Sequence, residues 1–220
     1  RAARHGHAES GHAASPPRAG PKTAFALRKP RAVCTGASWG LDVRECDAWI
    51  DFYDKLNGPD WVHCSEYRLD PCGCPQARWG STVFCNTFQN YQHIHEVYLL
   101  ENNLRGQLPP SIGALKWLMA LDLSENDLHG EVPVELGNIP TLQALWLHHN
   151  PRLGGRLPQT LVKPNFYAFE LQMCNFSGPL PALNFYNISN CLVYGNVFDC
   201  PVPEESKTCG AACPKATVLI

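Results

Sequence analysis

The sequence of 220 residues has no long hydrophobic run. A membrane-spanning helix needs about 18 or more consecutive apolar residues, and no window approaches that length. Common catalytic motifs are also missing, because there is no G-x-S-x-G, no glycine-rich phosphate loop and no H-E-x-x-H. We therefore expect neither a transmembrane segment nor an enzyme, and predict no catalytic residue, no cofactor and no metal ion.

Acidic residues are scarce at the start of the chain. Seven of the 18 Lys and Arg residues precede residue 34, against one acid, Glu9. The remaining 11 basic and 19 acidic residues give the rest of the chain a net charge of −8. Because nucleic-acid binding requires clustered basic residues, no nucleic-acid partner is expected for this acidic body. Residues 1–33 lack periodic hydrophobicity and are predicted to form a basic tail, disordered unless a partner binds it.

Cysteine is absent between Cys85 and Cys174, although the chain has 11 cysteines. One group precedes this gap (Cys34, Cys46, Cys64, Cys72, Cys74 and Cys85), and another follows it (Cys174, Cys191, Cys200, Cys209 and Cys213). Groups that flank a cysteine-free centre are typical of disulfide-bonded caps formed in an oxidising compartment. The C-x-C of Cys72 and Cys74 has no second knuckle, so zinc is the weaker alternative. The odd total leaves at least one cysteine unpaired or paired with another chain.

From residue 94 onward the sequence repeats. Similar segments start 24 residues apart at Ile94, Leu118, Leu142 and Phe166, and a fifth starts at Ile188. Each segment contains an alternation that is typical of a short strand with one buried face. The period and the pattern L-x-x-L-x-L-x-x-N/C-x-L are those of a leucine-rich repeat.

The residue at the N/C position of the pattern follows each predicted strand. Asn102, Asn126 and Asn150 occupy it in three segments, and Cys174 occupies it in the fourth. An Asn amide there can satisfy buried backbone groups, each of which would otherwise cost about 1 to 3 kcal/mol. Pro151-Arg152 adds one residue after Asn150, which predicts a local bulge.

Caps are required because the terminal repeats would otherwise leave their hydrophobic sides in water. A helix is predicted over residues 46–58, with Asp47 as its N-cap and Asn57-Gly58 as its stop, followed by loops stapled by cysteines. The predicted α/β architecture is a leucine-rich repeat solenoid of about five repeats, with a parallel sheet on its concave face and an irregular or 3-10 convex side. Its parts are a tail (1–33), a cysteine-rich N-terminal cap (34–93), repeats (94–203) and a C-terminal cap or tail (204–220).

The second half of the repeats carries a more specific pattern, L-x-G-x-(I/L/V)-P-x-x-(L/I)-G-x-(L/I). LRGQLPPSIGAL and LHGEVPVELGNI match it throughout. The chain thereby resembles the plant-type extracellular leucine-rich repeat proteins, which include polygalacturonase-inhibiting proteins and receptor-like kinase ectodomains, with similar proteins in algae and protists. WIDFYDKLNGPDW, PCGC and RWGSTVFCN look like the N-terminal cap of that class, which implies a Cys72–Cys85 disulfide. The pairing of Cys34, Cys46, Cys64, Cys74, Cys200 and Cys209 stays open.

Two columns of residues are predicted on the exposed face of the sheet. One is Tyr98, Asp122, Trp146, Glu170 and Leu192, and the other is Leu100, Ser124, His148, Gln172 and Tyr194. Aromatic residues beside acids are typical of contact surfaces, although solvated strand residues would give the same columns. We predict that Tyr98, Asp122, Trp146, His148, Glu170, Gln172 and Tyr194 bind a protein or peptide, with a glycan as the alternative ligand.

Two chemical alternatives for this face are weaker. Side chains of adjacent strand residues diverge, so His148 and His149 are not expected to hold one metal ion, and zinc would need three or four ligands. Asp122 and Glu170 would lie about 9 to 10 Å apart, at or beyond the limit for an inverting glycosidase pair. They are also expected on an open surface, with no pocket to raise the pKa of either carboxyl.

The leading functional hypothesis is a secreted recognition module. The glycosylation sequons at Asn175 and Asn187 agree with a secreted or cell-surface location. The composition of the tail also resembles an organelle transit peptide, so an organelle lumen is the alternative. Two other functions are considered: a structural subunit of a surface, wall or lumenal assembly, and an inhibitor of a wall-degrading glycosidase.

Overall fold

The computed structural model describes residues 33–75, 81–88, 90–163 and 165–213. The predicted basic tail lies outside these residues except for Val33, as do residues 214–220 of the predicted C-terminal segment. Residues 76–80, which include the Trp79-Gly80 of the cap motif, also lie outside them. Within the described ranges, no helix has the length and apolar character needed to cross a membrane.

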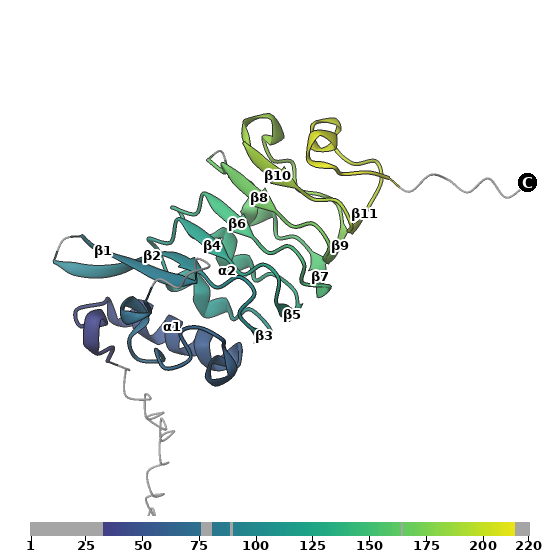
Figure 1. The fold of residues 1–220 in the computed structure, drawn as a ribbon. Coiled ribbons are helices and arrows are strands. Elements are labelled where there is room, and N and C mark those ends of the chain that lie inside the picture. Colours follow the sequence, from purple (N-terminus) through teal and green to yellow (C-terminus); the bar gives the residue numbers. More distant parts are fainter. Residues whose placement is uncertain (1–32, 76–80, 89, 164, 214–220) are drawn as a thin grey trace, which may run out of the picture. The chain divides into compact units, whose positions relative to one another are not determined.

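Successive coils of the chain contribute strands to two sheets (Figure 1). The first is six-stranded, in the order β1 (Thr82–Phe88), β2 (Tyr91–Tyr98), β4 (Ala120–Asp122), β6 (Ala144–Trp146), β8 (Ala168–Glu170) and β10 (Asn190–Leu192). From β2 to β10 every neighbouring pair is parallel, in the register that the repeat predicts.

A second sheet, which the sequence reasoning missed, forms from the L-x-G segments. Its strands are β3 (Arg105–Gly106), β5 (Asp127–Gly130), β7 (Arg152–Arg156), β9 (Asn175–Gly178) and β11 (Val197–Phe198). Short helical turns follow these strands: η4 (Pro110–Ala114), α2 (Val134–Gly137), η5 (Gln159–Leu161) and η6 (Phe185–Asn187). In η4, α2 and η5 the N-cap is the proline of the repeat, whose restricted φ suits the start of a helical turn.

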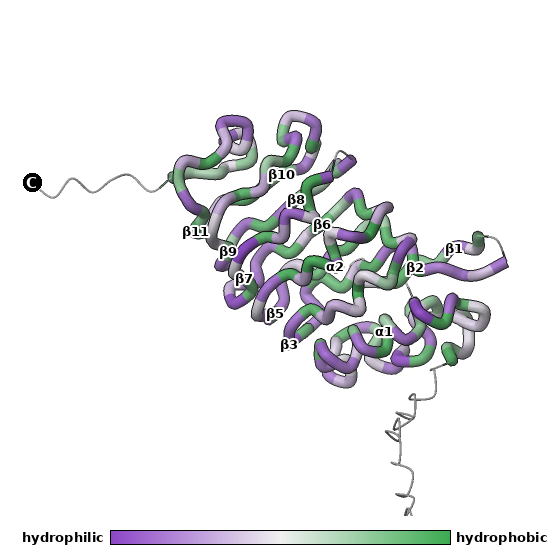
Figure 2. Tube along the Cα trace, turned by 180° about the vertical axis from the view of Figure 1, so that it is seen from behind, coloured by the Kyte–Doolittle hydropathy of each residue, from purple (hydrophilic) through white to green (hydrophobic). Residues whose placement is uncertain are grey.

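The core lies between the two sheets. Repeat positions such as Leu121, Leu145 and Phe169 are fully buried, and so are Leu128 and Leu153 from the second sheet. Figure 2 shows hydrophobic stretches recurring from coil to coil beside hydrophilic ones. Each buried side chain of this size contributes about 1.5 to 3 kcal/mol, so every coil adds to the stabilisation of the core.

The N-terminal cap contains the predicted helix in a shifted position. Helix α1 spans Val43–Lys55, and its N-cap is Asp42, whose side chain accepts a hydrogen bond from the backbone N–H of Arg44. The prediction of Asp47 as the N-cap was wrong, because Asp47 lies inside the helix. Asn57 has the left-handed conformation predicted for the stop, at φ 62°.

The rest of the cap is less irregular than expected. Three 3-10 turns, η1 (Gly36–Ser38), η2 (Gly58–Asp60) and η3 (Pro71–Gly73), accompany α1. Residues 59–75 are mainly turns and loops, as expected of a loop-rich segment, but Thr82–Phe88 forms the unpredicted strand β1, antiparallel to β2. The alternating segment TVFCNTF, rich in Thr, Val and Phe, suits an edge strand, and β1 extends the parallel sheet over the cap.

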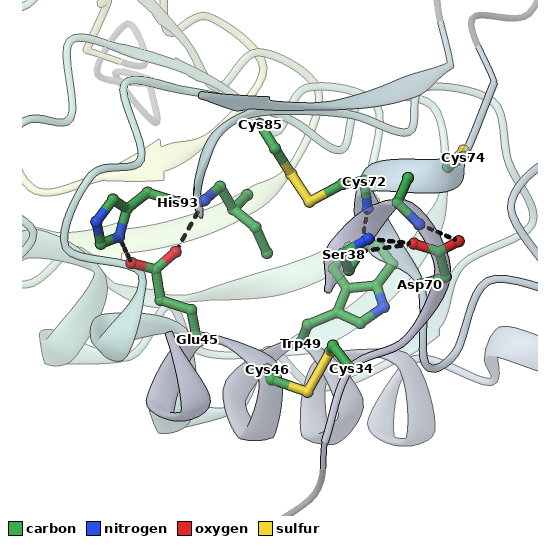
Figure 3. Close-up of a disulfide and its surroundings, with 12 residues drawn as sticks. Cys34, Ser38, Glu45, Cys46, Trp49, Asp70, Cys72, Cys74, Cys85 and His93 are labelled. Carbon is green, nitrogen blue, oxygen red and sulfur yellow. Dashed lines mark hydrogen bonds and ion pairs between the residues drawn. A yellow bond between two sulfur atoms is a disulfide. The ribbon is translucent and has the colours of Figure 1, made fainter. Parts of the chain in front are cut away.

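All 11 cysteines lie within the described residues, and ten of them are paired. Cys72 is bonded to Cys85, the pair that the family resemblance implies, beside a Ser38–Asp70 hydrogen-bond network (Figure 3). The other disulfides are Cys34–Cys46, Cys64–Cys74, Cys191–Cys209 and Cys200–Cys213. Cys191–Cys209 ties the final coil to the turn η7 (Glu204–Cys209), and Cys200–Cys213 ties it to the segment after that turn. Disulfides therefore occur at both ends of the repeats.

The Asn residues of the repeat satisfy backbone groups inside the turns, as the pattern predicts. Asn126 accepts from the N–H groups of Asn102 and Leu104, and donates to the carbonyls of Leu99, Leu123 and Ser124. Asn102 and Asn150 are fully buried and make similar bonds.

The bulge at Pro151-Arg152 explains why a cysteine is tolerated in the fourth segment. In the preceding coil the N–H of Leu128 donates to the side-chain oxygen of Asn150, one coil further on. The inserted residue lets the equivalent N–H of Leu153 bond to the carbonyl of Asn150 in its own coil, at 3.0 Å. A side-chain acceptor at position 174 is therefore not needed, and Cys174 makes only weak thiol contacts there.

Cys174 is the free cysteine, and its burial predicts a defined thiol count. Burial raises the pKa of its thiol to about 11, which keeps it protonated and unreactive at neutral pH. We expect titration with a thiol reagent to find no accessible thiol in the native protein and one after unfolding without reductant. Several thiols after unfolding would contradict the disulfide set, and Cys174→Ser is the control that removes the signal.

Candidate functional site

The outward-facing side of strands β2, β4, β6, β8 and β10, with the turn residue that follows each strand, is called the sheet face here. Its floor is a row of three small residues, Ala120, Ala144 and Ala168, each no more than 2% exposed. The side chains of Tyr98 and Trp146 pack over this row. Small side chains thus let the two aromatic rings lie against the sheet.

Trp146 lies at the centre of the face. In the strand register it lies between Asp122 on β4 and Glu170 on β8. Its indole N–H donates to Oε1 of Glu170 at 3.2 Å, and its ring centroid is 6.3 Å from those of Tyr98 and Tyr167. Trp146 and Tyr98, predicted on the solvent-facing side of the sheet, are half-buried there by the alanine row and by each other.

The side chain of Asp122 is partly buried on this face. Burial raises the pKa of its carboxyl, while hydrogen bonds from the N–H and hydroxyl of Ser124, at 3.0 and 2.6 Å, lower it. The expectation of an open surface that raises the pKa of neither carboxyl was therefore wrong for Asp122. Burial also raises the pKa of the Tyr98 phenol, helped by the neighbouring carboxylate of Glu96.

His148 and His149 converge, contrary to the expectation for neighbouring strand residues. Their Nδ1 atoms are 2.8 Å apart, so one nitrogen donates to the other. The reason is the turn: His149 has φ 55°, and the equivalent Glu101, Glu125 and Met173 are also left-handed. The chain has left the strand before His149, and strand alternation no longer applies.

The nearest carboxylate to His148 is that of Glu170. Nε2 of His148 is 4.0 Å from Oε2 of Glu170, and burial lowers the pKa of His148, so its imidazole is neutral at pH 7. Among the described residues no group of three or more His, Cys, Asp or Glu is placed to hold a metal ion.

Gln172, one of the predicted contact residues, is only 4% exposed in the structure. Its Nε2 donates to Oε2 of Glu170 at 3.3 Å, while its Oε1 is buried with no hydrogen-bond partner. Gln172 and Trp146 together orient the Glu170 carboxylate. Tyr194, at 45% exposed, is accessible in the last coil as predicted.

Two aromatic residues of this region were missed from sequence. Tyr167, the residue before Ala168 of strand β8, is 44% exposed, and its ring packs against Trp146. Phe84 on β1 is 41% exposed and packs edge-on against Tyr98. Tyr167 occupies the same repeat position as Met119 and Gln143, a signal that could have been used. Phe84 had none, because β1 lies outside the repeats.

Solved structures share this arrangement of coils. The leucine-rich repeat ectodomain of the receptor kinase SOBIR1 from Arabidopsis thaliana has a TM-score of 0.61 and 25% identity, over 76% of this chain and 88% of that chain. A chain of the BIR3–SERK2 complex from Arabidopsis thaliana has a TM-score of 0.58 and 26% identity, over 74% and 87%. A chain from the complex of the Arabidopsis receptor kinase HAESA with the peptide hormone IDA and the co-receptor SERK1 has a TM-score of 0.55 and 21% identity, over 70% and 26%.

No family model and no curated protein matches the sequence. The parallel sheet, the Asn residues of the turns and these structural neighbours define the class: the chain is a leucine-rich repeat protein. Within that class its structure is similar to the ectodomains of plant receptor kinases.

Proposed function

We propose that this chain is a non-enzymatic recognition module that binds a protein or peptide across the sheet face, on the concave side of the solenoid. The observation that carries the proposal is Trp146, held between two carboxylates over an alanine floor with its ring accessible in part. Half-buried aromatic residues in an oriented polar setting are the usual centres of protein interfaces. Tyr98 and Tyr167 widen the same surface.

The structural neighbours support a protein or peptide as the class of ligand. One similar chain comes from a complex of two proteins, BIR3 and SERK2, and another from a receptor complex that holds a peptide hormone. The proposal takes from them the class of ligand and nothing about its sequence.

The proposal includes a secreted or cell-surface location. It also includes an architecture of five repeats between disulfide-bonded caps. Five disulfides require an oxidising compartment to form and persist. Asn175 and Asn187, the sequon residues, are both exposed. Mass spectrometry before and after glycosidase treatment of the native protein tests whether they carry glycans.

The binding proposal is tested by the double variant Trp146→Ala/Glu170→Ala, which removes the ring and its hydrogen-bond partner. The unmodified chain is first used to capture its partner from the organism's own extract, and we expect the double variant to lose that partner. The Kd should rise at least about 30-fold, as for a residue pair at the centre of an interface that contributes about 2 kcal/mol. Trp39→Ala is the matched control, because Trp39 is 79% exposed and lies in the N-terminal cap. Unchanged capture by the double variant would refute binding through this face.

A further inference from the structure

We infer that the sheet face selects a cationic ligand, a stretch of protein or peptide whose contacting side chains are Lys or Arg. The inference rests on the proposed function, because it names the chemistry of the partner at the same site. It uses three observations: the charge of the face, the geometry around Trp146 and the unpartnered amide oxygen of Gln172.

The charge of the face has one sign. Strands β2, β4, β6, β8 and β10, with the four residues after each, contain no Lys or Arg. They contain five acids: Glu96, Glu101, Asp122, Glu125 and Glu170. Charge complementarity of this kind governs which partners associate and how fast. An acidic ligand would meet carboxylates with no compensating cation on these strands.

The geometry around Trp146 fits a cation. Asp122 and Glu170 flank the indole in register, and the aromatic rings of Tyr98 and Tyr167 adjoin it. A guanidinium or ammonium over an indole face gains a cation–π interaction, and flanking carboxylates add charge-assisted hydrogen bonds. The hydrogen bonds from Trp146 and Gln172 already hold the Glu170 carboxylate in place, so less ordering is needed when a ligand binds.

Gln172 supplies the independent observation. Its Oε1 is a buried acceptor without a partner, and its Nε2 is bonded to Glu170. Reversing the amide would place an oxygen against the Glu170 carboxylate, so the observed orientation is the favourable one. An unsatisfied buried acceptor costs about 1 to 3 kcal/mol. A guanidinium, with five N–H donors and no acceptor, is the side chain best suited to satisfy both Glu170 and this oxygen.

A pH dependence follows from the groups around His148. Glu170, Asp122, Glu125 and His149 surround its imidazole, and its pKa is lowered by burial. His148 is therefore neutral at pH 7 and becomes charged only as the pH falls below its usual range. Asp122, whose pKa is raised by burial, takes up its proton earlier than an ordinary Asp on the same descent. Both events make the face less negative, so binding of a cationic ligand weakens as the pH falls.

The test uses three libraries of short random peptides on beads, whose charged residues are restricted to Lys and Arg, to Asp and Glu, or to none. The full chain, fluorescently labelled, is applied at pH 7 and physiological ionic strength, and Kd values are measured for the best peptides by anisotropy. We expect the Lys/Arg library to supply the tightest peptides. Their affinity should fall at least about tenfold with Asp122→Asn/Glu170→Gln, fall as salt is added, and fall as the pH is lowered from 7 to about 4.

Matched variants separate this inference from the proposed function. Glu131→Gln/Glu135→Gln changes the net charge equally and lies outside the strands of the sheet face, so affinity should be unchanged. Thermal melts establish that each variant is folded, and Asp122→Asn alone serves if the double variant is not. Equal or tighter binding of neutral or acidic peptides that Trp146→Ala abolishes would overturn the cationic preference and leave the binding face intact. Basic peptides whose affinity Trp146→Ala leaves unchanged would overturn both.

Discussion

Replacing Asn126 by alanine is expected to lower the free energy of unfolding by about 4 kcal/mol, near the upper end for single substitutions. Its side chain makes five hydrogen bonds to the backbone of two coils. Alanine leaves the N–H groups of Asn102 and Leu104 and the carbonyl of Leu99 without this partner, at about 1 to 3 kcal/mol for each group that water does not reach. The other two carbonyls keep hydrogen bonds from Asn150 and Glu101. Denaturant unfolding followed by circular dichroism measures the change.

Asn184→Ala is the matched control for this measurement. Asn184 is exposed at the start of η6 and makes no side-chain capping bond, so its replacement should change stability by less than about 0.5 kcal/mol. A similar loss for both variants, or a loss below about 1 kcal/mol for Asn126→Ala, would show that the turn hydrogen bonds contribute little to stability.

Replacing Glu45 by alanine is the second large effect, at about 3 to 5 kcal/mol. Glu45 on α1 is 3% exposed; its Oε1 is 2.7 Å from Nδ1 of His93, and its Oε2 accepts from the N–H of Ile94 at 2.8 Å (Figure 3). These bonds join the cap helix to β2, the first strand of the parallel series. Alanine leaves a buried imidazole and a buried N–H unpartnered.

Glu45→Gln separates the hydrogen bonds from the charge. Its amide can accept from Ile94 and donate to His93, while the burial that raises the pKa of Glu45 no longer acts on a charged group. We expect this variant to unfold within about 1 kcal/mol of the unmodified protein. Equal losses for Glu45→Ala and Glu45→Gln would show that the carboxylate charge, and not the hydrogen bonding, holds the cap to the sheet.

The repeat was readable because each coil repeats the same physical requirement. Leu121, Leu145 and Phe169 must be buried, and a residue such as Asn126 must bond to the turn, so the spacing of 24 residues predicts a parallel sheet. The second sheet and strand β1 were not predicted. Strands of two to five residues in the second sheet carry little alternation, and β1 pairs with β2 outside the repeat.

The candidate site divides in the same way. The sequence by itself determined the columns, and therefore that Asp122, Trp146 and Glu170 lie side by side, because strand alternation and a regular period leave one register. Only the tertiary structure decided that Gln172 is buried, that His148 and His149 converge and that Trp146 rests on alanines. Those outcomes depend on left-handed turns and on the volumes of side chains from neighbouring coils, which no local pattern specifies.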